Sequence, residues 1–161
     1  MLATANHTTT PRSTAFGLLT LRVVVATIFI MHGGQKLFVY GFEGTSQFMA
    51  STGLPLPELS AAAAIAAELL GGLALLFGAF TRWVTPPLAF TMLVAAVTVH
   101  LKGGFFLPSG IEYTLILFAA SIALALTGPG ALAVDNLRHR NRLAAVEDNV
   151  PRTGVQHVEA A

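Results

Sequence analysis

Cysteine is absent from the 161-residue chain, and charged residues are scarce. Without a thiol, the chain itself can form no disulfide, thiolate metal site or dithiol redox centre. Charged residues make up 11% of the chain, against about 25% in a typical soluble domain. Hydrophobic residues make up 54%, and the mean hydropathy is +0.70. This composition is typical of a membrane protein.

Several functional classes lack their sequence signals here. The formal net charge is only +1, and no basic patch is interleaved with aromatic residues, so we expect no nucleic-acid partner. The chain has no Rossmann fingerprint and no cofactor-binding motif. We therefore predict no intrinsic cofactor and no metal site, and any electron carrier would have to come from a partner.

The longest apolar stretch, Phe16–Phe38, carries three titratable side chains, Arg22, His32 and Lys36. It exceeds the roughly 20 residues that a helix needs to cross a bilayer. Steps of three and four place the three side chains on one helix face. A charge that faces lipid is costly, so this face should point toward other helices or a water-filled cavity. No small-residue cleavage site follows, which argues against a signal peptide.

Three further apolar stretches give four predicted spans, at about 16–38, 59–80, 84–101 and 111–127. The prediction is an all-α, four-helix transmembrane bundle over residues 16–135. Polar residues 1–15 and 136–161 are expected to be disordered cytoplasmic arms, with an interfacial helix within 132–146. Glycine and proline predict a loop over 39–58, with a short interfacial helix at 45–51. Thr81 and Arg82 are expected to form a tight turn.

The distribution of basic residues sets the expected orientation. With four spans, five arginines fall on one side of the membrane: Arg12, Arg82, Arg138, Arg140 and Arg142. Two lysines, Lys36 and Lys102, fall on the other side. Positive residues collect on the cytoplasmic side, so both termini are predicted to be cytoplasmic.

This topology gathers polar residues near the outer end of the bundle. The candidate ligand-binding residues there are His32, Lys36, His100, Glu112 and Tyr113. Glu68 lies near the middle of the second span, where an acid is a functional-site candidate by default. Its partner could be Arg22, His32 or Lys36, and the outer cluster is favoured because it has more cationic groups. Arg22 is a candidate for a structural ion pair.

Each candidate also has a purely structural interpretation. Lys36 and Glu112 lie near span ends, where long side chains can extend to the interface. His32 and His100 could be hydrogen-bonded inside the bundle without any ligand. Glu68 could belong to a structural ion pair.

A set of motifs resembles the DoxX family of small bacterial membrane proteins. The motifs are HGGQKL at 32–37, GLPLP at 53–57, AELLGGLALLFGAFTR at 67–82, HLKGGFF at 100–106, GIEYTLILFAA at 110–120 and GPG at 128–130. Their order and spacing carry the resemblance, which covers about residues 16–135. The residues shared with the family pattern are His32, Lys36, Glu68, Arg82, His100, Glu112 and Tyr113.

The resemblance implies a four-helix protein of the bacterial inner membrane. The family takes its name from a subunit linked to quinone-dependent oxidation of thiosulfate, and relatives are associated with oxidative-stress assemblies. A shared fold does not by itself transfer an activity.

Three functional hypotheses follow. The first is a redox-associated subunit, acting with a soluble or membrane redox partner, whose outer pocket holds a quinone or a small anion. His, Lys and Tyr would donate hydrogen bonds to it, and Glu68 would relay a proton. The second is a non-enzymatic scaffold or small permease subunit. The third is a haem protein with His32 and His100 as axial ligands.

Overall fold

The computed structural model describes residues 11–138 and 141–142, and within these residues all regular structure is helical. Three helical rods are long and apolar enough to cross a membrane: Arg12–Val39, Pro57–Phe77 and Thr81–Gly103. A shorter apolar helix, α6 (Glu112–Thr127), follows them. The prediction of an all-α fold built on long apolar helices is confirmed.

The first rod consists of α1 (Arg12–Gly34), which continues directly into a π-helical turn, η1 (Gln35–Val39). It begins earlier than expected, so the prediction of disorder up to residue 15 is wrong for 12–15. The backbone carbonyl of Pro11 accepts the first helical hydrogen bond, from the N–H of Ala15 at 3.1 Å. Proline is tolerated at a helix start because it lacks an N–H that would need a partner there. Residues 1–10 lie outside the described residues.

A helix, α2 (Gly41–Ser51), occupies most of the segment predicted as a loop. Gly41 has φ +71°, which lets the chain change direction between the end of η1 and the start of α2. The short helix predicted at 45–51 is confirmed and begins four residues earlier. Thr45 and Met49 are buried, which anchors one face of α2 to the protein.

The second rod consists of α3 (Pro57–Ala66), a π-helical turn, η2 (Ala67–Gly71), and α4 (Gly72–Phe77). It ends at Gly78, whose φ of +63° is the left-handed conformation that commonly terminates helices.

The third rod consists of α5 (Thr81–Ala95), a π-helical turn, η3 (Ala96–His100), and a short 3₁₀ turn, η4 (Leu101–Gly103). Thr81 and Arg82 belong to its first turn, so the tight turn predicted there is displaced to residues 78–80. The carboxylate of Asp135 accepts hydrogen bonds from the backbone N–H groups of Phe80 and Thr81, at 2.8 and 2.9 Å. A residue more than 50 positions away therefore caps α5, which local sequence could not indicate.

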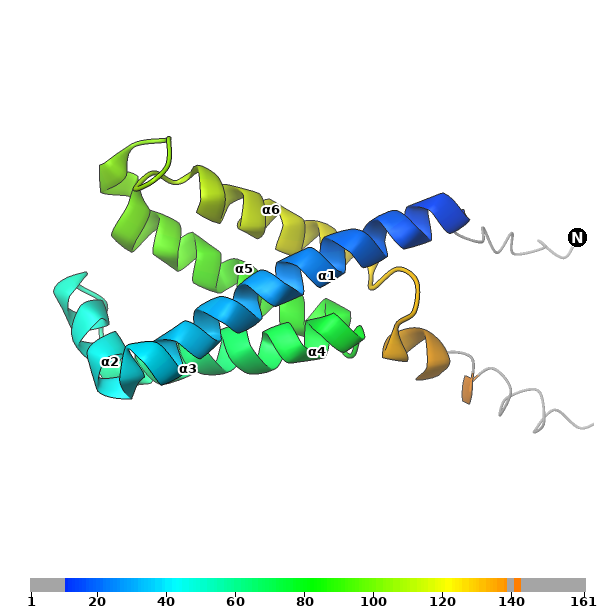
Figure 1. The fold of residues 1–161 in the computed structure, drawn as a ribbon, viewed down its shortest axis with the longest axis horizontal. Coiled ribbons are helices and arrows are strands. Elements are labelled where there is room, and N and C mark those ends of the chain that lie inside the picture. The colour runs from blue at the N-terminus through cyan, green and yellow to red at the C-terminus, as the bar shows by residue number, and fades with distance from the viewer. Residues whose placement is uncertain (1–10, 139–140, 143–161) are drawn as a thin grey trace, which may run out of the picture.

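Figure 1 shows that the rods cross at one end and splay apart at the other. α1 packs along η2 and α4, α5 packs along α6, and α2 lies against α3 and η1. The buried core lies where the rods cross; its members are Val25, Ala26, Phe29, Leu75, Leu88, Met92, Leu117 and Leu124. The splayed end leaves room between the α1–α3 side and the α5–α6 pair.

The start of α1 and the end of α6 lie at the same end of the molecule, opposite α2 and the α5–α6 connection (Figure 1). A hydrogen bond from the N–H of Ala131 to the carbonyl of Ala15, at 2.9 Å, joins the two. Beyond α6, residues 134–138 and 141–142 are helical, in line with the predicted 132–146 helix. The rest of the tail lies outside the described residues.

Candidate ligand-binding site

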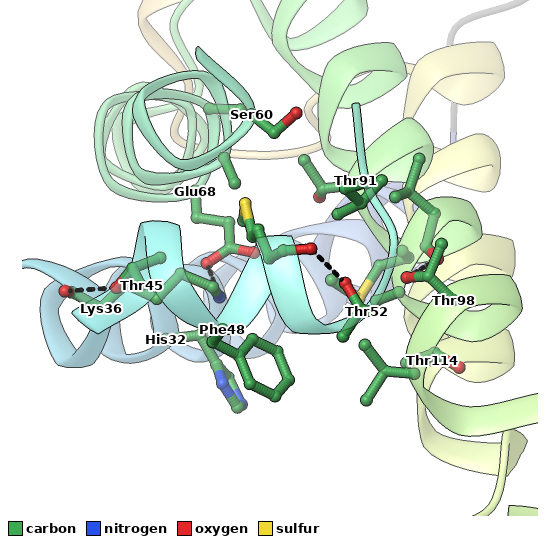
Figure 2. A pocket seen from close by; sticks show the side chains of 18 of the residues that line it. His32, Lys36, Thr45, Phe48, Thr52, Ser60, Glu68, Thr91, Thr98 and Thr114 are labelled. Atoms are coloured by element: carbon green, nitrogen blue, oxygen red, sulfur yellow. Dashed lines mark hydrogen bonds and ion pairs between the residues drawn. The ribbon is translucent and has the colours of Figure 1, made fainter. Parts of the chain in front are cut away.

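A cavity of about 1110 Å³ fills the splayed end of the molecule, between α1, α2 and α3 on one side and α5 and α6 on the other. Figure 2 shows Glu68 and Ser60 on one side of this space and Thr91 and Thr98 across from them. Most of the lining is apolar. Five of the predicted site residues line it: His32, Lys36, Glu68, His100 and Tyr113.

The backbone around this cavity departs from a regular α-helix in all three rods. Lys36 lies in η1, Glu68 in η2 and His100 in η3. A π-helical turn inserts an extra residue into the helix and so changes the direction of the side chains that follow; such turns are frequent at functional sites. Each rod therefore presents a polar side chain to the cavity from a locally widened turn.

Lys36 and Glu68 form an ion pair, with 2.5 Å between Nζ and Oε2. It is the one ion pair found in the described part of the chain. Glu68 is only 3% exposed and Lys36 is 24% exposed, so the carboxylate lies deeper than the ammonium group. This confirms the prediction that Glu68 pairs with the outer cluster, and the alternative pairing with Arg22 is wrong.

Close contact between α1 and η2 makes the pair possible. A Cβ atom added to Gly33 would lie 2.7 Å from the backbone nitrogen of Leu69 and 3.1 Å from the Cβ of Glu68. Only glycine permits this approach. Lys36 follows Gly33 by three residues, so its side chain lies on the same face of the rod and meets Glu68.

α2 closes the cavity on the side of η1. The hydroxyl of Thr45 donates a hydrogen bond to the backbone carbonyl of Lys36, at 2.9 Å. Phe48 and Met49 from the same helix and Thr52, which follows its last residue, also line the cavity. Figure 2 shows Phe48 and Thr52. α2 thus fixes the widened turn that carries Lys36 and supplies much of the cavity wall.

The two histidines lie on opposite sides of the cavity. The rings of His32 and Tyr113 are tilted against each other, with centroids 6.2 Å apart. His100 Nδ1 lies 3.2 Å from the carbonyl oxygen of Ser109, within the connection between α5 and α6. This hydrogen bond agrees with the structural interpretation of His100, although its ring also lines the cavity.

Glu112 is not among the residues that line the cavity. Its Oε1 accepts a hydrogen bond from the backbone N–H of Leu107, at 2.8 Å. Its own N–H donates to the carbonyl of Phe105, at 3.0 Å. Glu112 therefore closes the connection before α6, and its own side chain does not line the cavity.

Arg22 is 1% exposed and makes no ion pair within the described residues. Its Nη1 donates to the carbonyl of Pro129 at 2.6 Å, and its Nη2 to the carbonyl of Leu132 at 3.2 Å. Within the described residues, these hydrogen bonds and not an ion pair hold the guanidinium group. Once α6 has ended, these carbonyls have no helical partner and serve as acceptors for the guanidinium group.

Sequence reasoning missed the threonine, methionine and phenylalanine side chains of the lining. The residues concerned are Phe29, Thr45, Phe48, Met49, Thr52, Phe90, Thr91, Met92, Thr98 and Thr114. A signal was present on α2, where Thr45, Phe48, Met49 and Thr52 follow helical spacing. The sequence predicted a short helix at 45–51 but placed it at the membrane interface, so its contact with the cavity was missed.

The cavity combines a large apolar volume with few polar groups. Lys36 and Tyr113 can donate hydrogen bonds, and Glu68 can accept a proton. The threonine hydroxyls in the lining already donate to backbone carbonyls, so they can only accept hydrogen bonds from a ligand. Because Lys36 is paired with Glu68, this ion pair adds no net charge. No cluster of three or more His, Asp or Glu suited to a metal ion occurs in the described ranges. The arrangement is suited to a ring-sized ligand with hydrogen-bond acceptors.

Comparison with known proteins agrees with this description. The DoxX family profile matches residues 17–101. The chain is 44% identical over 124 residues to the Bacillus subtilis (strain 168) protein named "Putative oxidoreductase CatD", which covers 77% of this chain and 88% of that protein. It is 36% identical over 124 residues to the Escherichia coli (strain K12) "Inner membrane protein YphA", covering 73% of this chain and 87% of that one.

A second Escherichia coli (strain K12) relative, "Inner membrane protein YqjF", is 32% identical over 132 residues, covering 77% of this chain and 93% of that protein. No solved structure matches the chain significantly. The family profile, the extent of these matches and the long apolar rods agree with one another. The chain is a multi-pass membrane protein of the DoxX family.

Proposed function

We propose that the protein is a redox-associated subunit of the bacterial inner membrane, built as a four-helix bundle whose outer cavity holds a quinone. The names of its relatives, two inner membrane proteins and one "Putative oxidoreductase", are in line with this location and role. Electrons would be exchanged with a redox partner, because the chain carries no redox group of its own.

The proposed topology has four crossings with both termini in the cytoplasm. α6 would be the fourth crossing; its 16 residues span about 24 Å at 1.5 Å per residue, somewhat short of the roughly 30 Å hydrocarbon core. Local thinning of the bilayer accommodates such a mismatch at modest cost. The orientation is supported by basic residues at one end of the molecule, where α1 starts and the segment after α6 lies. These residues are Arg12, Arg82, Arg138 and Arg142.

The observation that carries the proposed ligand is the Lys36–Glu68 pair inside an otherwise mainly apolar cavity. A free lysine would favour a small anion, but here Glu68 compensates its charge. A neutral ring with carbonyl oxygens can accept hydrogen bonds from Lys36 and Tyr113 without a net change of charge. The apolar wall then buries the ring itself.

In this proposal Glu68 is the proton relay. Reduction of a quinone takes up protons, and the Glu68 carboxylate can first accept a proton and then, as the carboxylic acid, donate it to the reduced ring. Lys36 orients that carboxylate, and α2 holds Lys36 in place through Thr45. His32 and His100, on opposite walls, provide further sites for proton exchange.

The proposal can be tested by tryptophan quenching in nanodiscs. Trp83, the single native tryptophan, is 80% exposed and is not among the cavity-lining residues. Replacement by phenylalanine, combined with Phe48→Trp, places one reporter at the cavity. Decylubiquinone should quench this reporter saturably, whereas Trp83 in the unmodified protein should show only unsaturable quenching.

Two acid variants of the reporter protein provide the matched comparison. Glu68→Gln should weaken binding about tenfold, because it breaks the ion pair that presents Lys36. Glu112→Gln, an acid outside the cavity, should leave binding unchanged. Unsaturable quenching of the reporter, or equal effects of the two variants, would refute the proposal and favour the scaffold or permease role. Competition by thiosulfate would instead favour a small anion.

A further inference from the structure

α3 and α5 both line the cavity, yet they do not pack closely against each other. α5 contacts the second rod at η2 and α4, and beyond η2 the two helices diverge. The cavity reaches into the space between them. From α3 the lining residues are Ser60, Ala63 and Ala64, and from α5 they are Pro87, Phe90, Thr91, Met92, Val94 and Ala95.

This space lies at the depth of the hydrocarbon core. Ala63 is six residues beyond the start of α3, about 9 Å from the outer end of the rod. Phe90 is nine residues beyond the start of α5, about 14 Å from the opposite end. Both positions therefore lie well inside a bilayer about 30 Å thick.

Two of the residues that line the cavity here are strongly accessible to solvent. Ala63 is exposed, and Phe90 is 65% exposed. High accessibility of lining residues on both helices indicates that the cavity is open, rather than closed, at the gap between α3 and α5. On α3 this gap is bordered by alanines, whose short side chains leave the opening unobstructed.

The ion pair lies just inside this opening. Glu68 is five residues beyond Ala63 on the same rod, about 8 Å deeper by helical rise. Figure 2 shows Glu68 on one wall and Thr91 on the facing wall. A ring held at Glu68 would leave an attached chain pointing toward the gap between α3 and α5.

We propose that the gap between α3 and α5 is a lateral portal. A tailed ligand dissolved in the bilayer enters the cavity through this portal, with its ring leading and its tail behind. The polar ring binds at Lys36 and Glu68, and the apolar tail remains in the gap, in contact with lipid. The identity of the ring rests on the function proposed above. The route itself rests on the lining and the exposure of α3 and α5.

The test narrows the gap with one side chain and measures how fast a tailed ligand arrives. Ala63→Phe, in the Phe48→Trp/Trp83→Phe reporter protein, projects a ring into the gap. Ala62→Phe is the matched control, because Ala62 is also exposed on α3 but does not line the cavity. Stopped-flow quenching in nanodiscs gives the association rate of decylubiquinone for each variant.

Ala63→Phe should slow association of decylubiquinone about tenfold relative to Ala62→Phe. Saturation by ubiquinone-0, which has no tail, should be the same in both variants and verifies that the cavity is intact. Equal association rates in the two variants would overturn the portal while leaving the quinone site standing. An absence of saturable quenching in the reporter protein itself would overturn the proposed function and the portal with it.

Discussion

Replacing Gly33 by alanine should affect the stability of the protein much more than replacing its neighbour Gly34. A Cβ at Gly33 would lie 2.7 Å from the backbone nitrogen of Leu69. At Gly34 the nearest atom lies 3.9 Å away and belongs to the flexible side chain of Phe38. The first position is therefore blocked by the backbone of another rod, and the second is free.

The expected cost follows from these distances. At Gly33 the new atom falls about 0.7 Å short of the 3.4 Å at which ordinary contact begins, so α1 and η2 must move apart. Overpacking of this kind typically costs about 1–3 kcal/mol. The higher helix propensity of alanine raises the unfolding free energy by up to about 1 kcal/mol at either position, so this contribution cancels when the two variants are compared. The difference between the variants is thus predicted to be about 1–3 kcal/mol.

The unfolding free energy of the two variants should be compared in the same bilayer mimic, with decylubiquinone affinity as a second measurement. Gly33→Ala should also weaken binding, because separating α1 from η2 draws Lys36 away from Glu68. Gly34→Ala should bind like the unmodified protein. If the two variants were equally stable and bound equally well, the close crossing of α1 and η2 described here would be wrong.

Two further predictions concern the buried charges. Lys36→Met should lower the unfolding free energy by about 3 kcal/mol, because it leaves the buried Glu68 carboxylate unpaired. Lys102→Met, at an exposed position, should change it by less than about 0.5 kcal/mol. Equal effects of the two variants in a denaturation series would contradict the ion pair. Arg22→Met should lower the unfolding free energy by about 1–3 kcal/mol and increase hydrogen exchange in residues 128–138, because the carbonyls of Pro129 and Leu132 lose their donor. Exchange that stays at the level of the unmodified protein would show that Arg22 does not hold this segment.

The sequence indicated the all-α character and the long apolar rods because both depend on local composition and period. Helix ends were less predictable. The true start of α5 depends on Asp135, whose carboxylate caps the helix from a distant part of the chain. α2 was partly concealed because Gly41 and Gly44 are typical of loops, although only Gly41 adopts a positive φ.

The candidate site was partly predictable for the same reason. Span directions and helical rise were enough to predict which polar residues lie near one another. The five that line the cavity are His32, Lys36, Glu68, His100 and Tyr113. Glu112 was included because it lies at the same depth, but its carboxylate turns toward the backbone of Leu107. Depth can be estimated from the sequence, whereas the direction of a side chain cannot.

Composition and helical period are enough to indicate that this chain lies in a membrane and that its few ionisable groups are sheltered from lipid. The partners of those groups become known only from the folded chain: Lys36 meets Glu68, and Arg22 meets the carbonyls of Pro129 and Leu132. The physical reason is that hydrophobic periodicity fixes depth and face along a single helix. Partners across helices depend instead on where backbones approach, and that is set by single glycines and by segments far apart in the chain.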